Sequence, residues 1–208
     1  MTDRHRHGGA KMNRRCQDGG VDEHDVDSAV RAMVDILAPH AAADWSVQAG
    51  SVEWSCWSTA AHVAHDLLAY AGQVAARPRG GYLPFDLEVR RDATVDDCLA
   101  AVQACGTLLS SAIATSPAGA VGWHYGPTDP SGFAAMGAAE TLLHTYDITR
   151  GLGLNWRPPG SLCLAILHRL VPDAPAGEPA QVLLWVTGRA DLDGHRRVTE
   201  WVWKAANV

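Results

Sequence analysis

The chain has 208 residues, a formal net charge of −6 and a pI of about 5.9. This acidic balance, without a basic stripe, argues against nucleic acid as the main partner. We find no apolar run near the roughly 20 residues that span a bilayer and no secretory signal in the polar start of the chain, so we expect no membrane partner.

Residues 1–23 mix charges of both signs with glycine and show no hydrophobic period, so we expect a disordered leader. The chain has five cysteines, an odd number, and no CxxC pair, which argues against a disulfide framework. We therefore expect a reduced, cytoplasmic protein. Cys98 and Cys105, on a predicted helix, are expected to pack as small apolar groups.

Residues 24–153 predict a mainly α unit. Apolar residues recur at helical spacing over about 25–40, 55–76, 94–115 and 131–152. Thr94 and Asp97 resemble a capping box, with Asp in place of the usual Glu, and Gly151 and Gly153 suit the end of the fourth helix. At 1.5 Å per residue these helices are roughly 25–33 Å long, which predicts a four-helix bundle.

Residues 154–208 predict a small α/β C-terminal extension packed on the bundle. Residues 161–170 have helical spacing, and residues 180–192 suit either a helix or a strand. Alternation with β-branched and aromatic residues near 198–204 favours a strand. Its partner strand is left open, and so is the choice between a monomer and a homodimer.

Glu140 and His144 are the most informative residues of the chain. On a helix, positions i, i+4 and i+7 share one face, which these residues share with Asp147. Phe133 and Met136 fall on the same face, so this stripe should face a core. Burying such polar groups unpaired costs kilocalories each. A divalent metal would compensate, because imidazole and carboxylate suit zinc and other first-row ions.

A third ligand is available on the second predicted helix. Metal sites in bundles use inward-pointing residues from facing helices. His62 and His65 are the candidates, and both lie on the polar arc of that helix. Periodicity does not choose between them, and both also fit solvated residues with Asp66 as a nearby partner.

The long Gly/Pro-rich loop before the fourth helix is of a kind that is often functional. Its His124 is a candidate acid/base or substrate contact at the mouth of a metal site, and it also fits a solvated loop histidine. Asp147 is a candidate acceptor that orients the His144 imidazole, or a residue that supports the helix end. Arg150 and Tyr82 are further candidates for substrate contacts.

Three segments resemble the DinB-like superfamily of metal proteins. In WSCWSTAAHVAHDLLAYAGQ, His62 follows Trp54 by eight residues, which resembles the start of that superfamily's second helix. GFAAMGAAETLLHTYDITRGLG resembles its last bundle helix, with an ExxxHxxD run. LLWVTGRADLDGHRRVTEWVWKA resembles the segment after the bundle in the actinobacterial branch, which includes the mycothiol-dependent maleylpyruvate isomerases. The resemblance covers roughly residues 25–205.

The resemblance implies three metal ligands, His62, Glu140 and His144, whereas His65 falls where relatives often have Asp. Three protein ligands leave coordination positions open, as in catalytic sites. The metal would be zinc by default, with nickel, manganese or iron as alternatives.

The resemblance also implies thiol chemistry. The metal would activate a low-molecular-weight thiol such as mycothiol, and the thiolate would attack a small electrophilic substrate in an isomerisation or S-transfer reaction. Two alternatives stay open on the same residues. One is a hydrolase that uses metal-bound water, and the other is a non-catalytic bundle that binds a small molecule or a partner.

Overall fold

The computed structural model describes residues 20–203, 205 and 206, and these residues form a mainly helical protein. We predicted a leader over residues 1–23, and residues 1–19 of it lie outside the described part of the chain. Its last residues do not fit the prediction, because Val21 is buried and Asp22 caps the first helix. Residues 21–23 therefore belong to the folded part of the chain, contrary to the prediction.

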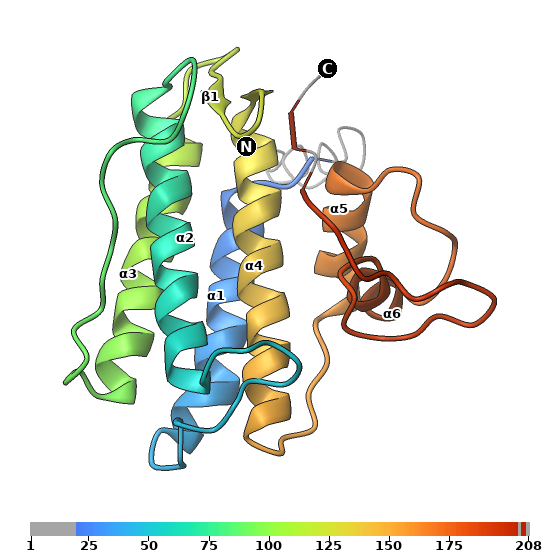
Figure 1. The fold of residues 1–208 in the computed structure, drawn as a ribbon. Helices are drawn as coiled ribbons and strands as arrows, with labels where there is room; N and C mark the ends of the chain where they lie inside the picture. The colour runs from blue at the N-terminus through green and yellow to red at the C-terminus, as the bar shows by residue number, and fades with distance from the viewer. Residues whose placement is uncertain (1–19, 204, 207–208) are drawn as a thin grey trace, which may run out of the picture.

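Four long helices lie side by side along the molecule (Figure 1). They are α1 (Glu23–Leu37), α2 (Cys56–Ala76), α3 (Val95–Ala114) and α4 (Pro130–Gly151), and a 3₁₀ turn, η1 (Ala38–His40), extends α1. Both α1 and α2 pack against α3 and α4. The mainly α prediction is thereby confirmed. Both ends of each predicted helix lie within one helical turn of the observed ends.

Side-chain caps fix where two of these helices begin. The predicted capping box of α3 is confirmed: the Asp97 amide donates to Thr94 Oγ1 at 3.1 Å, and the Thr94 amide donates to Asp97 Oδ2 at 3.0 Å. At the start of α4 the Gly132 amide donates to Asp129 Oδ1 at 2.8 Å. Pro130 fits the first turn of α4, where its missing N–H removes no helical hydrogen bond.

Helix α4 is the central element, since its residues from Gly132 to Thr149 are buried all round except at the half-buried Tyr146. It packs against α3 closely because position 137 is glycine: a Cβ there would lie 2.6 Å from Leu109 Cδ2. A polar side chain in the middle of α4 must therefore find its partners inside the protein.

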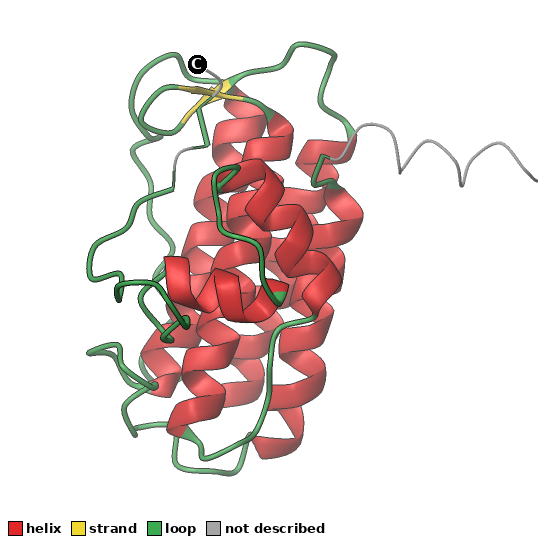
Figure 2. Ribbon diagram, turned by 90° about the vertical axis from the view of Figure 1, so that its right-hand side faces the viewer, coloured by secondary structure: helices red, strands yellow, loops and turns green. Residues whose placement is uncertain are grey.

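Two shorter helices follow, α5 (Gly160–Leu170) and α6 (Pro179–Val186). Helix α5 packs on α4, and α6 runs roughly across the long helices (Figures 1 and 2). For residues 180–192 the sequence allowed either a helix or a strand, and the structure has a helix that ends at Val186.

The strand predicted near 198–204 is wrong, and with it the α/β character of the C-terminal extension. Residues 198–203 form no strand. A strand needs a neighbour that shares its ladder of hydrogen bonds, and the described residues around this segment offer none. The segment instead lies against α4 and uses its side chains there, as described below.

A small antiparallel sheet, which the sequence did not predict, forms in the loop before α4. Strands β1 (Gly122–Trp123) and β2 (Pro127–Thr128) pair Gly122 with Thr128 and Trp123 with Pro127. The turn between them holds Tyr125 at φ 52, a left-handed conformation that costs a non-glycine residue about 1–2 kcal/mol. This hairpin positions His124 and Tyr125 beside α2.

By length and composition alone, α3 qualifies as a membrane span, with a mean hydropathy of 1.4. The expectation that no apolar run approaches this length was therefore wrong. Within the protein, 44% of that stretch is buried, and its exposed positions include Asp96, Gln103 and Ser111. A core helix of a soluble protein passes the same test.

The four described cysteines are buried and free, and Cys98 and Cys105 pack as predicted among apolar residues. Burial raises the pKa of the Cys56 and Cys98 thiols to about 11 and that of Cys163 to about 12. It also raises the pKa of Cys105. These thiols are poor nucleophiles near neutral pH.

Candidate metal centre

Three of the predicted residues meet between α2 and α4. One ligand atom each of His62, Glu140 and His144 lies within 4.8 Å of the others. His144 Nε2 is 3.3 Å from Glu140 Oε2, and the His62 and His144 rings meet edge-on with centroids 5.2 Å apart. His65, the alternative that periodicity left open, lies outside the cluster with its ring stacked 6.3 Å from that of His62.

The donor set fits a divalent cation. Two imidazole nitrogens and one carboxylate oxygen are ligands that zinc and other first-row ions accept. Bonds of about 2.0–2.2 Å place ligand atoms roughly 3–4 Å apart around such an ion. The separation of Glu140 from His144 already matches this, and His62 needs only a small side-chain shift. The cluster can therefore hold a metal ion.

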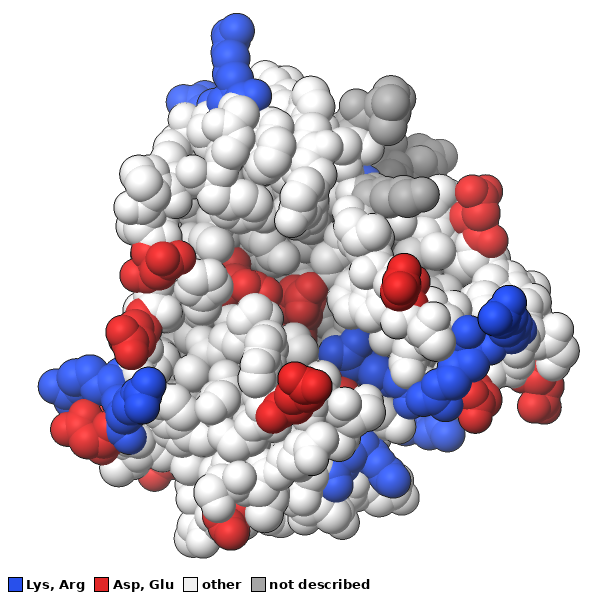
Figure 3. Space-filling view, in the orientation of Figure 1, with Lys and Arg blue, Asp and Glu red and all other residues white. Residues whose placement is uncertain are grey.

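The cluster is buried on one side and open on the other. Glu140 is 7% exposed and His144 is 5% exposed, whereas the His62 side chain is 31% exposed. All three line a cavity of about 520 Å³, whose wall also includes Trp54 and Trp201. Figure 3 shows a hollow on this face, between α2 and the C-terminal segment, with acidic side chains inside it. An ion held here would keep an accessible side, as in catalytic centres.

Asp147 lies where the predicted acceptor for His144 would lie. Its Oδ2 is 3.0 Å from His144 Nδ1, which leaves Nε2 of that ring facing Glu140. Asp147 is itself held by Arg189, whose Nε donates to Oδ1 at 3.0 Å and whose Nη2 donates to Oδ2 at 2.7 Å. Such a carboxylate contact fixes the orientation of a ligating imidazole.

The C-terminal segment (residues 187–203) also fixes the second buried ligand. Trp203 Nε1 donates to Glu140 Oε1 at 2.6 Å. The Arg189 guanidinium lies over the Trp201 ring, 5.7 Å from its centroid. Sequence analysis missed both Arg189 and Trp203. They are 42 and 63 residues away from their partners, and no local spacing connects positions so distant.

Charge inside the cluster is balanced by these contacts. Burial disfavours the Glu140 carboxylate, but the hydrogen bonds of His144 and Trp203 and the charges of His144 and Arg189 outweigh it and lower its pKa. Burial also disfavours the His144 imidazolium, but hydrogen bonds to Asp147 and Glu140 and both negative charges raise its pKa to about 9. Before a cation binds, Glu140 and His144 therefore form a buried ion pair.

This ion pair predicts how metal affinity depends on pH. A cation must displace the His144 proton, so its affinity should rise about tenfold per pH unit up to about pH 9 and then level off. In the metal-free protein the stability of the fold changes with pH in the opposite direction. The raised pKa stabilises the fold below about pH 6.5, and this contribution is lost as pH rises through about 9.

Competition against a chelator of known pH dependence, over this range, measures the affinity. Asp147→Asn is the matched variant, because it removes one of the charges that raise the pKa of His144. The levelling-off should then begin at a lower pH. An affinity that stays flat between pH 7 and 9 would contradict the prediction.

Trp203→Phe should weaken metal binding by about 10–100-fold, the usual effect of losing a contact that orients a ligand. The substitution keeps an aromatic ring in place but removes the N–H that holds Glu140. Trp201→Phe is the control. The Trp201 ring lies 4.7 Å from that of Trp203, but of these two tryptophans only Trp203 donates to Glu140. Equal zinc affinities of the two variants, measured by calorimetry, would show that the hydrogen bond is unimportant.

The other predicted site residues lie apart from the cluster. His124 is 8% exposed, and its Nδ1 forms a hydrogen bond with the Tyr82 hydroxyl in a neighbouring cavity. Burial lowers the pKa of His124, and the charges of Glu140 and Asp66 offset this only in part, so its ring is neutral near pH 7. Arg150 is exposed at the end of α4 and does not line either cavity.

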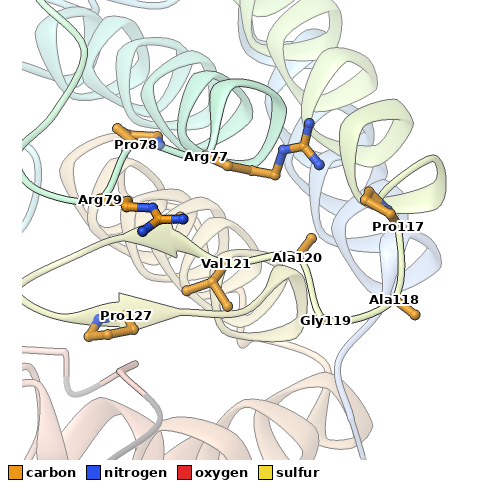
Figure 4. A pocket seen from close by; sticks show the side chains of 10 residues that line it. Arg77, Pro78, Arg79, Pro117, Ala118, Gly119, Ala120, Val121 and Pro127 are labelled. Carbon is orange, nitrogen blue, oxygen red and sulfur yellow. The ribbon is translucent and has the colours of Figure 1, made fainter.

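A further cavity, of about 630 Å³, lies between the end of α2 and the loop after α3. Its wall includes Arg77 and Arg79, but it contains none of the predicted metal ligands. In Figure 4 the two guanidinium groups lie well apart from each other, and both residues are exposed. This arrangement does not focus positive charge on one point, so the His–Glu–His cluster is the stronger candidate site.

No family model, no curated protein and no solved structure matches this chain. Fold and site together define a mainly helical protein with a buried His–Glu–His cluster that can hold a metal ion.

Proposed function

We propose that this protein is a DinB-like four-helix-bundle enzyme that uses a divalent metal ion to activate a low-molecular-weight thiol, such as mycothiol, for isomerisation or S-transfer on a small electrophilic substrate. The observation that carries the proposal is the cluster of His62, Glu140 and His144 in the wall of a cavity. The sequence resemblance supports thiol chemistry. Helical spacing supports a bundle over residues 24–153 with an extension over 154–208, and the cysteine content supports a cytoplasmic protein. A monomer and a homodimer both fit this proposal.

A bound divalent ion, zinc by default, would lower the pKa of a thiol so that a thiolate is available near neutral pH. The protein's part is to hold the ligands in place. Trp203 fixes Glu140, and Asp147 fixes His144. The ring of Trp54 lies 4.6 Å from that of His62 and narrows the open side of the cluster.

The reaction has two halves. The thiol loses its proton, and its sulfur forms a bond to an electrophilic carbon of the substrate. In isomerisation a later break of that same C–S bond returns the thiol, whereas in S-transfer another group leaves and the sulfur stays. The neutral His124 ring, in the neighbouring cavity, is the candidate to take or return a proton of the substrate.

Cobalt(II)-substituted protein offers a direct test, because coordination of a thiolate gives a strong charge-transfer absorption in the near ultraviolet. We expect this band when mycothiol or another small thiol is added, and we expect its loss in Glu140→Ala. Turnover of unsaturated acids or of aryl halides should then require both metal and thiol. Metal-dependent turnover of esters or amides without a thiol would instead favour the hydrolase alternative.

A further inference from the structure

A second cavity, of about 280 Å³, lies beside the metal centre. Helix α2, the loop after it and the β1–β2 hairpin enclose it, and four aromatic rings line it: Tyr70, Tyr82, Phe85 and Tyr125. It adjoins the cluster through Asp66, which lines this cavity and whose Oδ2 is 3.2 Å from His62 Nε2.

Specific contacts hold the walls of this cavity in place. Position 72 of α2 is glycine, and a Cβ there would lie 2.8 Å from Phe85 Cζ, so the Phe85 ring packs against the helix only because no side chain intervenes. The Tyr82 hydroxyl forms a hydrogen bond with His124 Nδ1. The His124 ring in turn meets those of Tyr125 and Tyr70 edge-on, with centroids 4.9 Å and 6.2 Å apart.

The charge of the cavity is negative. Asp66 and Asp86 line it, and no lysine or arginine is present among the described residues of its wall. Burial lowers the pKa of His124, so this ring does not offset the carboxylates near neutral pH. The hollow seen in Figure 3, at the adjoining metal centre, also contains acidic side chains. A positively charged ligand is favoured there over an anion.

Tyr70 adds a polar group to the wall of the cavity. The residue is 5% exposed and lines the cavity. Burial raises the pKa of Tyr70, and the nearby charges of Glu140 and Asp66 raise it further. The hydroxyl therefore stays protonated near neutral pH. A hydroxyl in the wall of the cavity can hydrogen-bond to a ligand bound there.

We propose that this cavity binds the alkylammonium group of a small organic amine. Ammonium groups are attracted to the faces of aromatic rings, and here rings and carboxylates surround one small space. The cavity volume suits the head group of an amine of amino-acid size. Because Asp66 adjoins His62, the far end of a bound amine would extend toward the metal centre. That last step rests on the proposed function, whereas amine binding itself does not.

Three probes test this: propylammonium, choline and 3,3-dimethyl-1-butanol, the uncharged carbon analogue of choline. Calorimetry or ligand-observed NMR on the full chain should show binding of at least one cation and at least tenfold weaker binding of the carbon analogue. Preference between the two cations distinguishes a primary from a quaternary ammonium site. Equal binding of choline and its analogue, or binding of neither cation, would overturn the proposal.

Substitutions locate the site. Asp86→Asn and Tyr70→Phe should each weaken cation binding by about 3–10-fold, the usual range for one exposed charge or one hydrogen bond. Glu88→Gln is the matched control, because Glu88 lies in the same loop but outside the wall of this cavity. If Glu88→Gln weakens binding as much as Asp86→Asn, general negative charge rather than this cavity attracts the amine.

The same titrations on Glu140→Ala separate this inference from the proposed function. Cation binding should survive in that variant within about threefold of the unmodified protein, whether or not a metal binds. If cation binding survives and neither protein binds a metal ion, only the proposed metal-dependent function is rejected. Loss of cation binding in a folded Glu140→Ala protein would place the amine at the metal cluster and overturn the assignment to this cavity.

Discussion

His144→Ala is expected to abolish stoichiometric binding of a divalent metal ion while the helical fold is kept. The substitution leaves two ligands, His62 and Glu140, on different helices. Since losing a mere orienting contact costs about 10–100-fold in affinity, loss of a ligand should cost about 100-fold or more. The neighbours keep partners, because Asp147 retains Arg189 and Glu140 retains Trp203. Metal content after dialysis, together with circular dichroism, measures both outcomes.

The matched control is His65→Ala. This histidine lies on the same helix as His62, and its ring stacks on that of His62, but it is outside the cluster. It should therefore retain a full equivalent of metal. If the unmodified protein binds no zinc and gains no thermal stability from zinc, the metal proposal is contradicted. A His144→Ala protein that binds metal as tightly as the His65→Ala protein would reject His144 as a ligand.

The buried face of α4 was predictable because its polar residues break an apolar helical stripe. Spacing alone put Glu140, His144 and Asp147 together, and the structure places all three in contact. The facing ligand was not predictable in this way. His62 and His65 share the polar arc of α2, and only the position of α4 against α2 separates them. Periodicity describes one helix, whereas a metal cluster depends on the approach of two.

The C-terminal segment shows a different limit. Its alternation of aromatic and other residues is real, because the Trp201 and Trp203 rings share a side, 4.7 Å apart, while Val202 between them is 62% exposed. Alternation reports only that successive side chains face opposite ways. Here Trp203 contacts α4 and Trp201 packs against Arg189, and neither is paired with a second strand. The alternation was therefore detected correctly, but the strand it predicted was wrong. Arg189 and Trp203 reach their partners by tertiary packing alone.

Arg189→Met is expected to lower the free energy of unfolding by about 3–5 kcal/mol, the usual cost of breaking a buried ion pair by removing one partner. The Arg189 and Asp147 side chains are only 7% and 2% exposed. Without the guanidinium, Asp147 keeps a single hydrogen bond, to His144. Against a typical total stability of roughly 5–15 kcal/mol this is a large loss, and urea unfolding monitored by circular dichroism measures it.

Two further variants make this test specific to the buried pair. Arg197 forms an ion pair with Asp191 at 2.9 Å, but their side chains are 52% and 79% exposed. Arg197→Met should therefore cost about 1 kcal/mol or less. Adding Asp147→Asn to Arg189→Met should recover part of the loss, because no carboxylate is then left without its cation. If Arg189→Met and Arg197→Met cost the same, Arg189 contributes no more than a surface charge. Asp147 would then have to orient His144 without its help.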